Sequence, residues 1–294
     1  MQFKPPFTNG MNASVVIGAP NFTTTSCTPG ANTLANVVWV AIDGNGDLWV
    51  SDNSSRIVEF VPPFSNGMAA SVVIGQASLS SSAGCNQSGS PTASTLCDPW
   101  GMAFDSSGNL WVSDLWNNRV LEFKPPFSNG MAASLELGQP SGATAFTSNA
   151  ANNPSLSATS LYNPVQTAFD GDGNLWVSDG DNNRVLEFVP PFSNGMAASL
   201  ELGQPSGATA FTSNDVATSQ SGLFYQYGIS FDSSGNMQVA DFVNNRVMIF
   251  DPPFSNGMNA TLVLGQANFT HGLPNQNGNV GANTLDYPYG GVTF

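Results

Sequence analysis

The chain has 294 residues, only 9% of them charged, and its formal net charge is −14 with six lysines and arginines in total. So few cations argue against a nucleic-acid partner, because phosphate binding needs clustered basic side chains. No apolar run approaches the length of a membrane span, so we expect no membrane insertion. The N-terminus lacks the apolar core of a signal peptide. We expect either that a signal has been removed or that the chain starts inside a longer one.

An internal repeat dominates the sequence and decides the expected fold. The segment Pro-Pro-Phe-(Ser/Thr)-Asn-Gly-Met begins at five places, 57 to 65 residues apart: Pro5, Pro62, Pro125, Pro190 and Pro252. A second block precedes the last four of these and runs from Asp105 to Phe123 in one copy. Residues 117–149 recur at 182–214 with a single change, Val189 in place of Lys124. Such near-identity indicates a recent duplication.

Each repeat predicts four short strands with turn residues between them. In one repeat these strands are Gly101–Phe104, Asn109–Ser113, Arg119–Phe123 and Ser134–Gly138. Apolar residues alternate in the second and third strands, and the turn Asp-Ser-Ser-Gly-Asn suits a hairpin because glycine supplies a positive φ. Pro-Pro ends the third strand, because proline cannot donate to a ladder. The sequence therefore predicts an all-β propeller of about five four-stranded blades, folded as one domain over residues 1–294.

The run Gly-Asn-Leu-Trp-Val-Ser-Asp-x-x-Asn-Asn-Arg-Val at residues 108–120 resembles the core of the NHL-repeat propeller family. Related runs extend the resemblance over nearly the whole chain, and it implies a propeller fold. Two features depart from the family. The repeat here is longer, with the excess between the fourth strand and the next first strand, and the second Asn of Asn-Asn-Arg stands where the family's name implies His.

The two ends of the chain supply parts of a fifth blade. Residues 287–294 contain its first strand, and the opening residues supply a truncated third strand and a fourth strand, Ser14–Gly18. The second strand and most of the third are missing, so we expect four complete blades and a fifth that is split and incomplete. Open strand edges are templates for another strand. The candidate assembly edges are Phe3, Val15, Val16, Val292 and Phe294.

Three readings of this fifth blade stay open. The chain is cut from a longer protein, such as a six-bladed propeller. Alternatively, the ring closes imperfectly with its end strands adjusting, or another subunit completes the blade and gives an assembly or filament.

An aspartate after each second strand and an arginine at the start of each third strand recur in every complete blade. We expect structural ion pairs that fix the hairpin, because a catalytic group is rarely needed four times. The pairs are Asp52–Arg56, Asp114–Arg119, Asp179–Arg184 and Asp241–Arg246.

Three cysteines occur in the chain. Cys85 and Cys97 bracket a Gly/Ser-rich stretch, and we expect them to form a disulfide; the alternative is three free, buried thiols. Cys27 occupies the place of Cys85 in its own repeat, where Ala35 stands at the partner position. It is therefore an odd cysteine, either free or paired between chains.

The sequence offers little recognisable chemistry. The turns at 43–47 and 170–174 resemble the oxygen-rich start of a calcium loop, but plain hairpin turns are the expected reading. His271 is the single histidine and is expected at the surface. The first strands, which would line a central channel, are apolar or small, with Gln166 and Ser230 as the main polar exceptions. We therefore expect no catalytic site, no metal and no cofactor.

The long inter-blade segments are the best functional candidates, because long loops usually bind or cover something. They are rich in aromatic residues, which either pack on their own propeller or form a canopy that contacts a partner. The weakly charged Ser/Thr/Asn/Gly surface is typical of extracellular or cell-surface β proteins. The sequence thus predicts a non-enzymatic extracellular scaffold that binds other copies of itself, another surface protein or glycans. The alternatives are a propeller enzyme, such as a metal-assisted lyase or lactonase, and a glycan- or protein-binding module.

Overall fold

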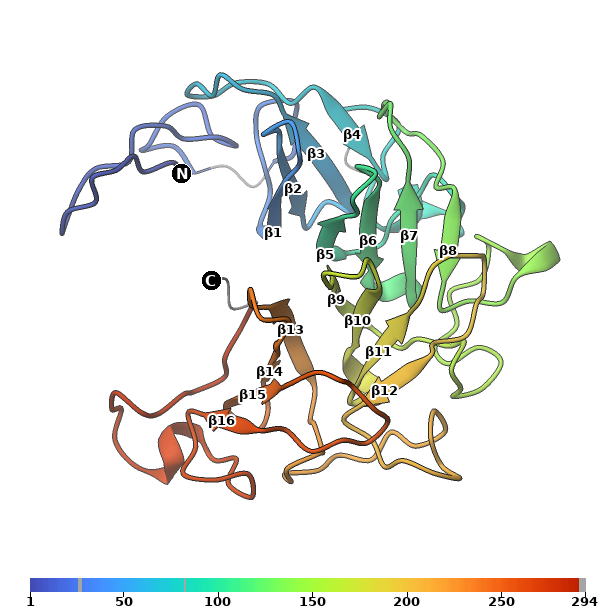
Figure 1. The fold of residues 1–294 in the computed structure, drawn as a ribbon. Coiled ribbons are helices and arrows are strands. Elements are labelled where there is room, and N and C mark those ends of the chain that lie inside the picture. Colours follow the sequence, from blue (N-terminus) through green and yellow to red (C-terminus); the bar gives the residue numbers. More distant parts are fainter. Residues whose placement is uncertain (26–27, 82, 291–294) are drawn as a thin grey trace.

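The computed structural model describes residues 1–25, 28–81 and 83–290. In these ranges the chain forms four antiparallel sheets, each built from four consecutive strands in sequence order (Figure 1). Figure 1 shows the sheets side by side along an arc, with the first strand of each sheet innermost and the fourth outermost. Each sheet is therefore a propeller-type blade, numbered here 1 to 4 along the chain. No helix of the described residues is long and apolar enough to cross a membrane.

The strand bounds repeat from blade to blade. They are β1 Val37–Ile42, β2 Leu48–Asp52, β3 Arg56–Phe60 and β4 Val72–Ile74 in blade 1; β5 Pro99–Phe104, β6 Leu110–Asp114, β7 Arg119–Phe123 and β8 Leu135–Leu137 in blade 2; β9 Pro164–Phe169, β10 Leu175–Asp179, β11 Arg184–Phe188 and β12 Leu200–Leu202 in blade 3; and β13 Gln226–Phe231, β14 Met237–Asp241, β15 Arg246–Phe250 and β16 Leu262–Leu264 in blade 4. Short 3₁₀ turns lie at Cys85–Ser88, Leu115–Asn117, Gly142–Thr144, Gly180–Asn182 and Pro274–Asn277.

The hairpin between the first two strands forms as the turn residues predict. Asp105 Oδ1 accepts the backbone N–H groups of Ser107 and Asn109, both at 2.9 Å. Gly108 has a φ of +78°, a conformation that side chains disfavour. The main difference from expectation is the start of β5 at Pro99 instead of Gly101. A register shift between Pro99 and Met102 keeps Pro99 opposite Asp114, which extends the strand.

The core lies between adjacent blades and not inside any one of them. Trp111 of blade 2 is fully buried and contacts Phe192 of blade 3 edge-on, with ring centroids 4.7 Å apart. Its indole N–H donates to Asp105 Oδ2 at 3.1 Å, so the buried ring leaves no unpaired polar group. Trp49 and Trp176 contact the following blade in the same way. One sheet alone could not bury these rings, so each blade depends on the next.

A repeated asparagine attaches each outer strand to the following blade. Asn194 of blade 3 accepts the backbone N–H of Glu136 in β8 at 2.8 Å. The N-terminal segment is held to blade 1 by the same contact, because Asn66 accepts the N–H of Val16 at 2.9 Å. This asparagine belongs to the Pro-Pro-Phe-Ser-Asn-Gly segment, which explains why that segment recurs with the blades.

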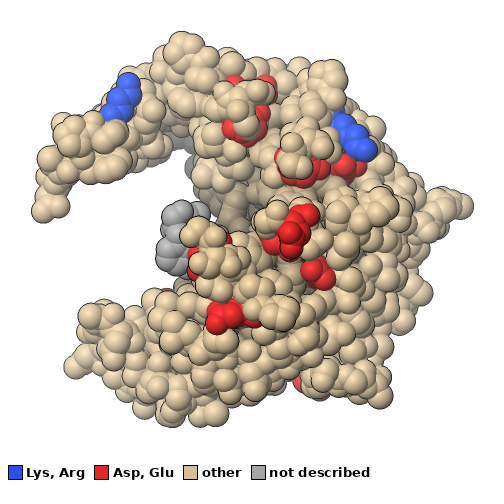
Figure 2. Space-filling view, in the orientation of Figure 1, with Lys and Arg blue, Asp and Glu red and all other residues tan. Residues whose placement is uncertain are grey.

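The expected fifth blade is represented by one antiparallel bridge, between Gln2 and Val15. Its register matches the pairing of Glu59 with Val72 in blade 1, so the N-terminal segment corresponds to third and fourth strands. The described residues contain no fifth sheet, and residues 291–294 of the expected first strand lie outside them. In the described part of the chain, the arc is open between the N-terminal segment and blade 4 (Figure 2).

Candidate functional site

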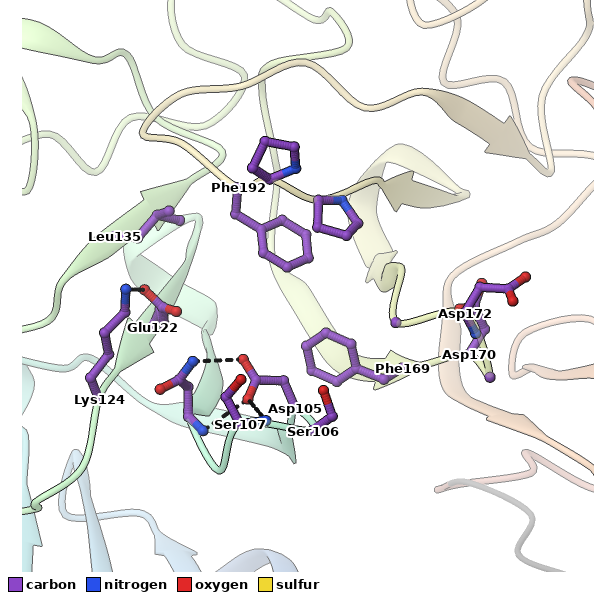
Figure 3. A pocket seen from close by; sticks show the side chains of 15 residues that line it. Asp105, Ser106, Ser107, Glu122, Lys124, Leu135, Phe169, Asp170, Asp172 and Phe192 are labelled. Carbon is purple, nitrogen blue, oxygen red and sulfur yellow. Dashed lines mark hydrogen bonds and ion pairs between the residues drawn. The ribbon is translucent and has the colours of Figure 1, made fainter.

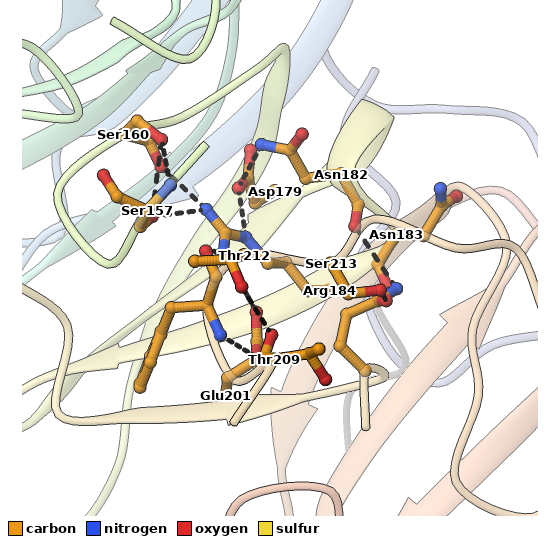
Figure 4. A network of polar contacts seen from close by, with 12 residues as sticks. Ser157, Ser160, Asp179, Asn182, Asn183, Arg184, Glu201, Thr209, Thr212 and Ser213 are labelled. Atoms are coloured by element: carbon orange, nitrogen blue, oxygen red, sulfur yellow. Dashed lines mark hydrogen bonds and ion pairs between the residues drawn. The ribbon is translucent and has the colours of Figure 1, made fainter. Parts of the chain in front are cut away.

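The four predicted Asp–Arg pairs are all buried ion pairs within their own blades. In blade 3, Arg184 Nε donates to Asp179 Oδ2 at 2.8 Å (Figure 4). The other four N–H donors of this guanidinium reach Glu201 Oε1 and three backbone carbonyls, those of Ser157, Ser160 and Phe211. Five donors thus meet five protein acceptors, so the arginine attaches the inter-blade loops to the hairpin and has no donor left for a ligand. Asp52–Arg56, Asp114–Arg119 and Asp241–Arg246 pair at 2.7–2.9 Å.

Blades 2 and 3 add a second carboxylate that the sequence patterns did not single out. Glu136 and Glu201 each accept a bond from the blade's arginine at 3.0 Å. Burial raises the pKa of Glu201, although the Phe211 N–H and the Arg184 guanidinium oppose this shift. Blades 1 and 4 carry Val73 and Val263 at this position, a difference visible in the aligned repeats.

The described cysteines form a disulfide between Cys85 and Cys97, within the segment that leads into blade 2. The Cys97 backbone N–H donates to Asp114 Oδ1 at 2.6 Å, which ties the disulfide to the buried ion pair. Cys27 lies outside the described residues. His271 is exposed, with its Nδ1 2.6 Å from Asn268 Oδ1.

Of the predicted assembly edges, Val15 and Val16 are buried, whereas Phe3 is exposed. Val292 and Phe294 lie outside the described residues. Val16 is hydrogen-bonded to Asn66 and Gly67 of blade 1, and Val15 pairs with Gln2 within the N-terminal segment.

The largest exposed strand faces lie at the two ends of the arc. On the entry face, which precedes blade 1, Val40 of β1 is 55% exposed. The residues at the same repeat position in the other blades are at most 3% exposed: Met102, Thr167 and Ile229. This difference arises because a preceding blade covers β5, β9 and β13 but not β1.

The exit face, beyond blade 4, is the counterpart at the other end. Leu264 of β16 is 46% exposed, whereas its equivalents Ile74, Leu137 and Leu202 are fully buried. A cleft of about 710 Å³ runs along this face, lined among others by Val247, Leu264 and Leu285. Gln238 stands where the other blades place the tryptophan of the inter-blade core. Gln238 is itself only 3% exposed, so the exposed part of the exit face lies around Leu264 and the cleft.

Six aromatic residues gather at one end of the first strands, here called the axial aromatic cluster: Trp100, Tyr225, Tyr227, Phe242, Tyr287 and Tyr289. Trp100 of blade 2 lies 5.4 Å from Tyr227 of blade 4, and Tyr289 lies within 5.8 Å of both rings, so the cluster spans non-adjacent blades. Burial is the main reason that the pKa values of Tyr225, Tyr227 and Tyr289 rise to about 12. Neighbouring charged or phenolic groups make a smaller contribution in the same direction. Tyr289 is nonetheless 62% exposed, which leaves aromatic surface available to a ligand.

Other loop aromatics pack inward. Phe146, Phe211 and Phe269 lie against the three inter-blade cores. These three loop phenylalanines thus pack on their own propeller, whereas Tyr289 is exposed.

Equivalent clefts lie between successive blades, at the ends that carry the β-hairpin turns. The cleft between blades 2 and 3 has a volume of about 500 Å³ and is lined by Asp105, Glu122 and Phe192 among others (Figure 3). Lys124 pairs with Glu122 there at 3.4 Å. Similar clefts of about 520 and 480 Å³ lie at the other two junctions. These clefts are mainly acidic, because each is lined by several carboxylates and Lys124 is the one cation among the lining residues. Figure 2 shows carboxylates in small groups around the arc.

The four sheets and their repeating networks define a repeat protein of β-propeller blades. Residues 96–123, which include β5, β6 and β7, match the NHL repeat. Blade 2 therefore contains an NHL repeat, and the resemblance seen in the sequence is confirmed there. No curated protein matches the chain.

Several solved structures are similar to this chain. Virginiamycin B lyase from Staphylococcus aureus has 13% identity and a TM-score of 0.43, over 76% of this chain and 60% of that one. A protein of unknown function from Bacteroides caccae has 12% identity and a TM-score of 0.45, over 78% of this chain and 60% of that one. The chain spans about three fifths of the length of these structures.

Proposed function

We propose that the chain is a non-enzymatic scaffold of the extracellular space or cell surface that associates with other copies of itself through its terminal faces. The observation that carries the proposal is the exposure of Val40 and Leu264 at repeat positions that internal junctions bury. Inside the molecule, blades 1, 2 and 3 each pack their outgoing face against the incoming face of the next blade. A head-to-tail contact between copies would repeat that junction, and such heterologous contacts build rings or filaments. We also propose that the two chain ends contribute strands to a fifth blade, and that a neighbouring copy of the chain supplies the strands this blade lacks.

Two further observations support a scaffold outside the cell. The charged groups that recur in each blade, such as Arg184 with its five internal bonds, are used to hold the blade together. The Cys85–Cys97 disulfide and the low content of charged residues are both typical of secreted proteins.

Sedimentation velocity over a range of concentrations tests the self-association. We expect the purified chain to form larger species as its concentration rises, and the variants V40D and L264D to shift it toward monomer, because a carboxylate in an apolar junction is costly. V189K is the matched control, since Val189 is exposed and blade 2 carries Lys124 at that position. A chain that stays monomeric throughout, or association that V40D and L264D leave unchanged, contradicts the proposal.

Glycan binding at the axial aromatic cluster is a second candidate. Half-exposed aromatic rings offer flat apolar faces with polar edges, a combination that suits sugar rings. Asp98, which accepts the Trp100 indole N–H at 3.1 Å, adds a carboxylate beside them. Titration with soluble oligosaccharides should quench tryptophan fluorescence, and W100A should abolish the change. Unchanged fluorescence with every sugar tested rejects this candidate and leaves the scaffold proposal standing.

A further inference from the structure

The β1–β2 hairpin of blade 1 brings three carboxylates together, here called the blade 1 acid triad: Asp43, Asp47 and Glu59. One carboxylate oxygen of each lies within 4.8 Å of the others. Calcium binds its oxygen ligands at about 2.3–2.6 Å, so ligands on opposite sides of the ion lie about 5 Å apart. The three oxygens therefore fit a single coordination sphere.

Asp47 is the unusual member of this triad. It exposes only 9% of its surface, and its carboxylate accepts no hydrogen bond from any described residue, although its backbone bonds to Asp43. The carboxylate oxygens of Asp47 are not sealed from solvent, so a hydrated cation can reach them. A largely buried carboxylate that no protein group neutralises is costly unless water or a cation compensates its charge. Burial and the nearby carboxylates raise the pKa of both Asp47 and Glu59.

The other three hairpins show what this position does without an ion. Each carries an asparagine whose Nδ2 donates to the first aspartate of its turn at 2.8–2.9 Å: Asn109, Asn174 and Asn236. Blade 1 replaces this attraction with the repulsion of two carboxylates. Lys124 pairs with Glu122 in blade 2, but Val61 stands at that position in blade 1. A cation from solution would supply the missing positive charge.

The lone pairs that remain free define the coordination that the triad offers. Asp43 Oδ1 accepts two backbone N–H groups at 2.9 Å, and its Oδ2 accepts the Trp49 indole N–H at 3.2 Å. Ser71 donates its hydroxyl to Glu59 Oε2. The acceptors that remain free to bind a cation are both Asp47 oxygens, Glu59 Oε1 and one lone pair of Asp43 Oδ2. Asp43 and Glu59 also line the cleft of about 520 Å³ toward blade 2, which gives water and ions access.

We propose that the blade 1 acid triad binds one partly hydrated calcium ion. The ligands are hard carboxylate oxygens in irregular positions, which calcium accepts more readily than magnesium does, and water completes the sphere. The site is independent of the proposed function, because it lies in a hairpin and not on the terminal faces. Its affinity should fall in the range of extracellular calcium modules, with a Kd of about 10⁻⁴–10⁻³ M.

Calcium titration of chelator-treated protein by calorimetry tests the site, with terbium luminescence as a second readout. Trp49, bonded to Asp43, should sensitise terbium emission, and calcium should compete it away. The key variant is D47N, which places in blade 1 the residue that the other three hairpins carry and should therefore fold. We expect D47N to weaken calcium binding at least tenfold. Wild-type protein without saturable binding up to about 10 mM, or D47N that binds as wild type does, overturns the proposal.

A gain-of-site variant provides an independent check. N174D installs the same three acids in blade 3, with Asp170 and Glu187 in place and Val189 matching Val61. We expect the calorimetric stoichiometry to rise from one ion to two. N109D in blade 2 should gain less, because the Lys124 ammonium already lies 3.4 Å from Glu122. If N174D folds but still binds only one calcium ion per chain, the three acids are not sufficient to form the site.

Discussion

The two inner blades and the two terminal blades have closely related sequences but differ in what surrounds them. Leu137 and Leu264 occupy the same repeat position, yet Leu137 is fully buried against blade 3 while Leu264 is 46% exposed. The inner blades hold their arginine between two carboxylates, whereas the terminal blades have a valine in place of the second. The comparison teaches that a blade's hairpins follow from its own sequence, whereas its core depends on its neighbours.

Gln238 shows how a terminal blade differs from the others at a single position. It replaces the tryptophan of blades 1 to 3 and bonds its own sheet instead, since its Oε1 accepts the Ser230 hydroxyl at 3.1 Å. A tryptophan there would find none of the phenylalanines that surround Trp111 among the described residues. Gln238 is only 3% exposed, so blade 4 replaces an aromatic contact between blades with a buried hydrogen bond inside its own sheet.

The largest expected effect is the removal of an inner-blade arginine. R184M leaves Asp179 and Glu201 buried without a cation, and breaking such a pair typically costs about 3–5 kcal/mol in the free energy of unfolding. R56M in a terminal blade should cost less, because Asp52 is the only carboxylate it bonds. Urea unfolding followed by tryptophan fluorescence measures both variants. An equal loss would mean that the second carboxylate of the inner blades adds no coupling.

The matched pair L137A and L264A tests the junction itself. L137A empties a fully buried position and should lower the free energy of unfolding by about 2–5 kcal/mol. L264A should lower it by less than about 1 kcal/mol, because water already reaches that side chain. The same urea assay applies, at a protein concentration low enough to keep the chain monomeric. A large loss in L264A would instead show that the exit face is covered in solution.

The smallest effect concerns the axial aromatic cluster, which joins inner blade 2 to terminal blade 4. Its three tyrosines with a pKa of about 12 should ionise about two pH units above an ordinary tyrosine. Between pH 10 and 12 the unfolded chain loses these protons while the folded chain keeps them. The cluster's contribution to stability is therefore complete below about pH 10 and lost as the pH rises through about 12.

Phenolate absorbance during alkaline titration measures this difference. Wild-type protein should show a late-titrating group of tyrosines, and Y227F should reduce it. Titration of all the tyrosines near pH 10 would mean that the cluster opens in solution and that blades 2 and 4 are not linked through it.

Much of the blade could be predicted from local sequence signals. Alternating apolar residues and the Asp-Ser-Ser-Gly-Asn turn placed β6 and β7 to within one residue, because strand pairing in a hairpin depends on neighbours in sequence. The aspartate and arginine that meet across Asp114–Arg119 were also visible, since the hairpin register places them opposite each other.

The remaining features needed the tertiary structure, because they join residues far apart in the chain. Glu136 reaches Arg119 from the next strand, but an acid stands at this position in only two of the four blades, and Trp100 meets Tyr227 from a non-adjacent blade. The exposure of Val40 and Leu264 also could not be read from their repeats, whose other copies are buried. The sequence by itself determined the blade, through strand periodicity and turn chemistry. Only the tertiary structure decided which faces are covered, because a sheet's face is buried by what packs against it.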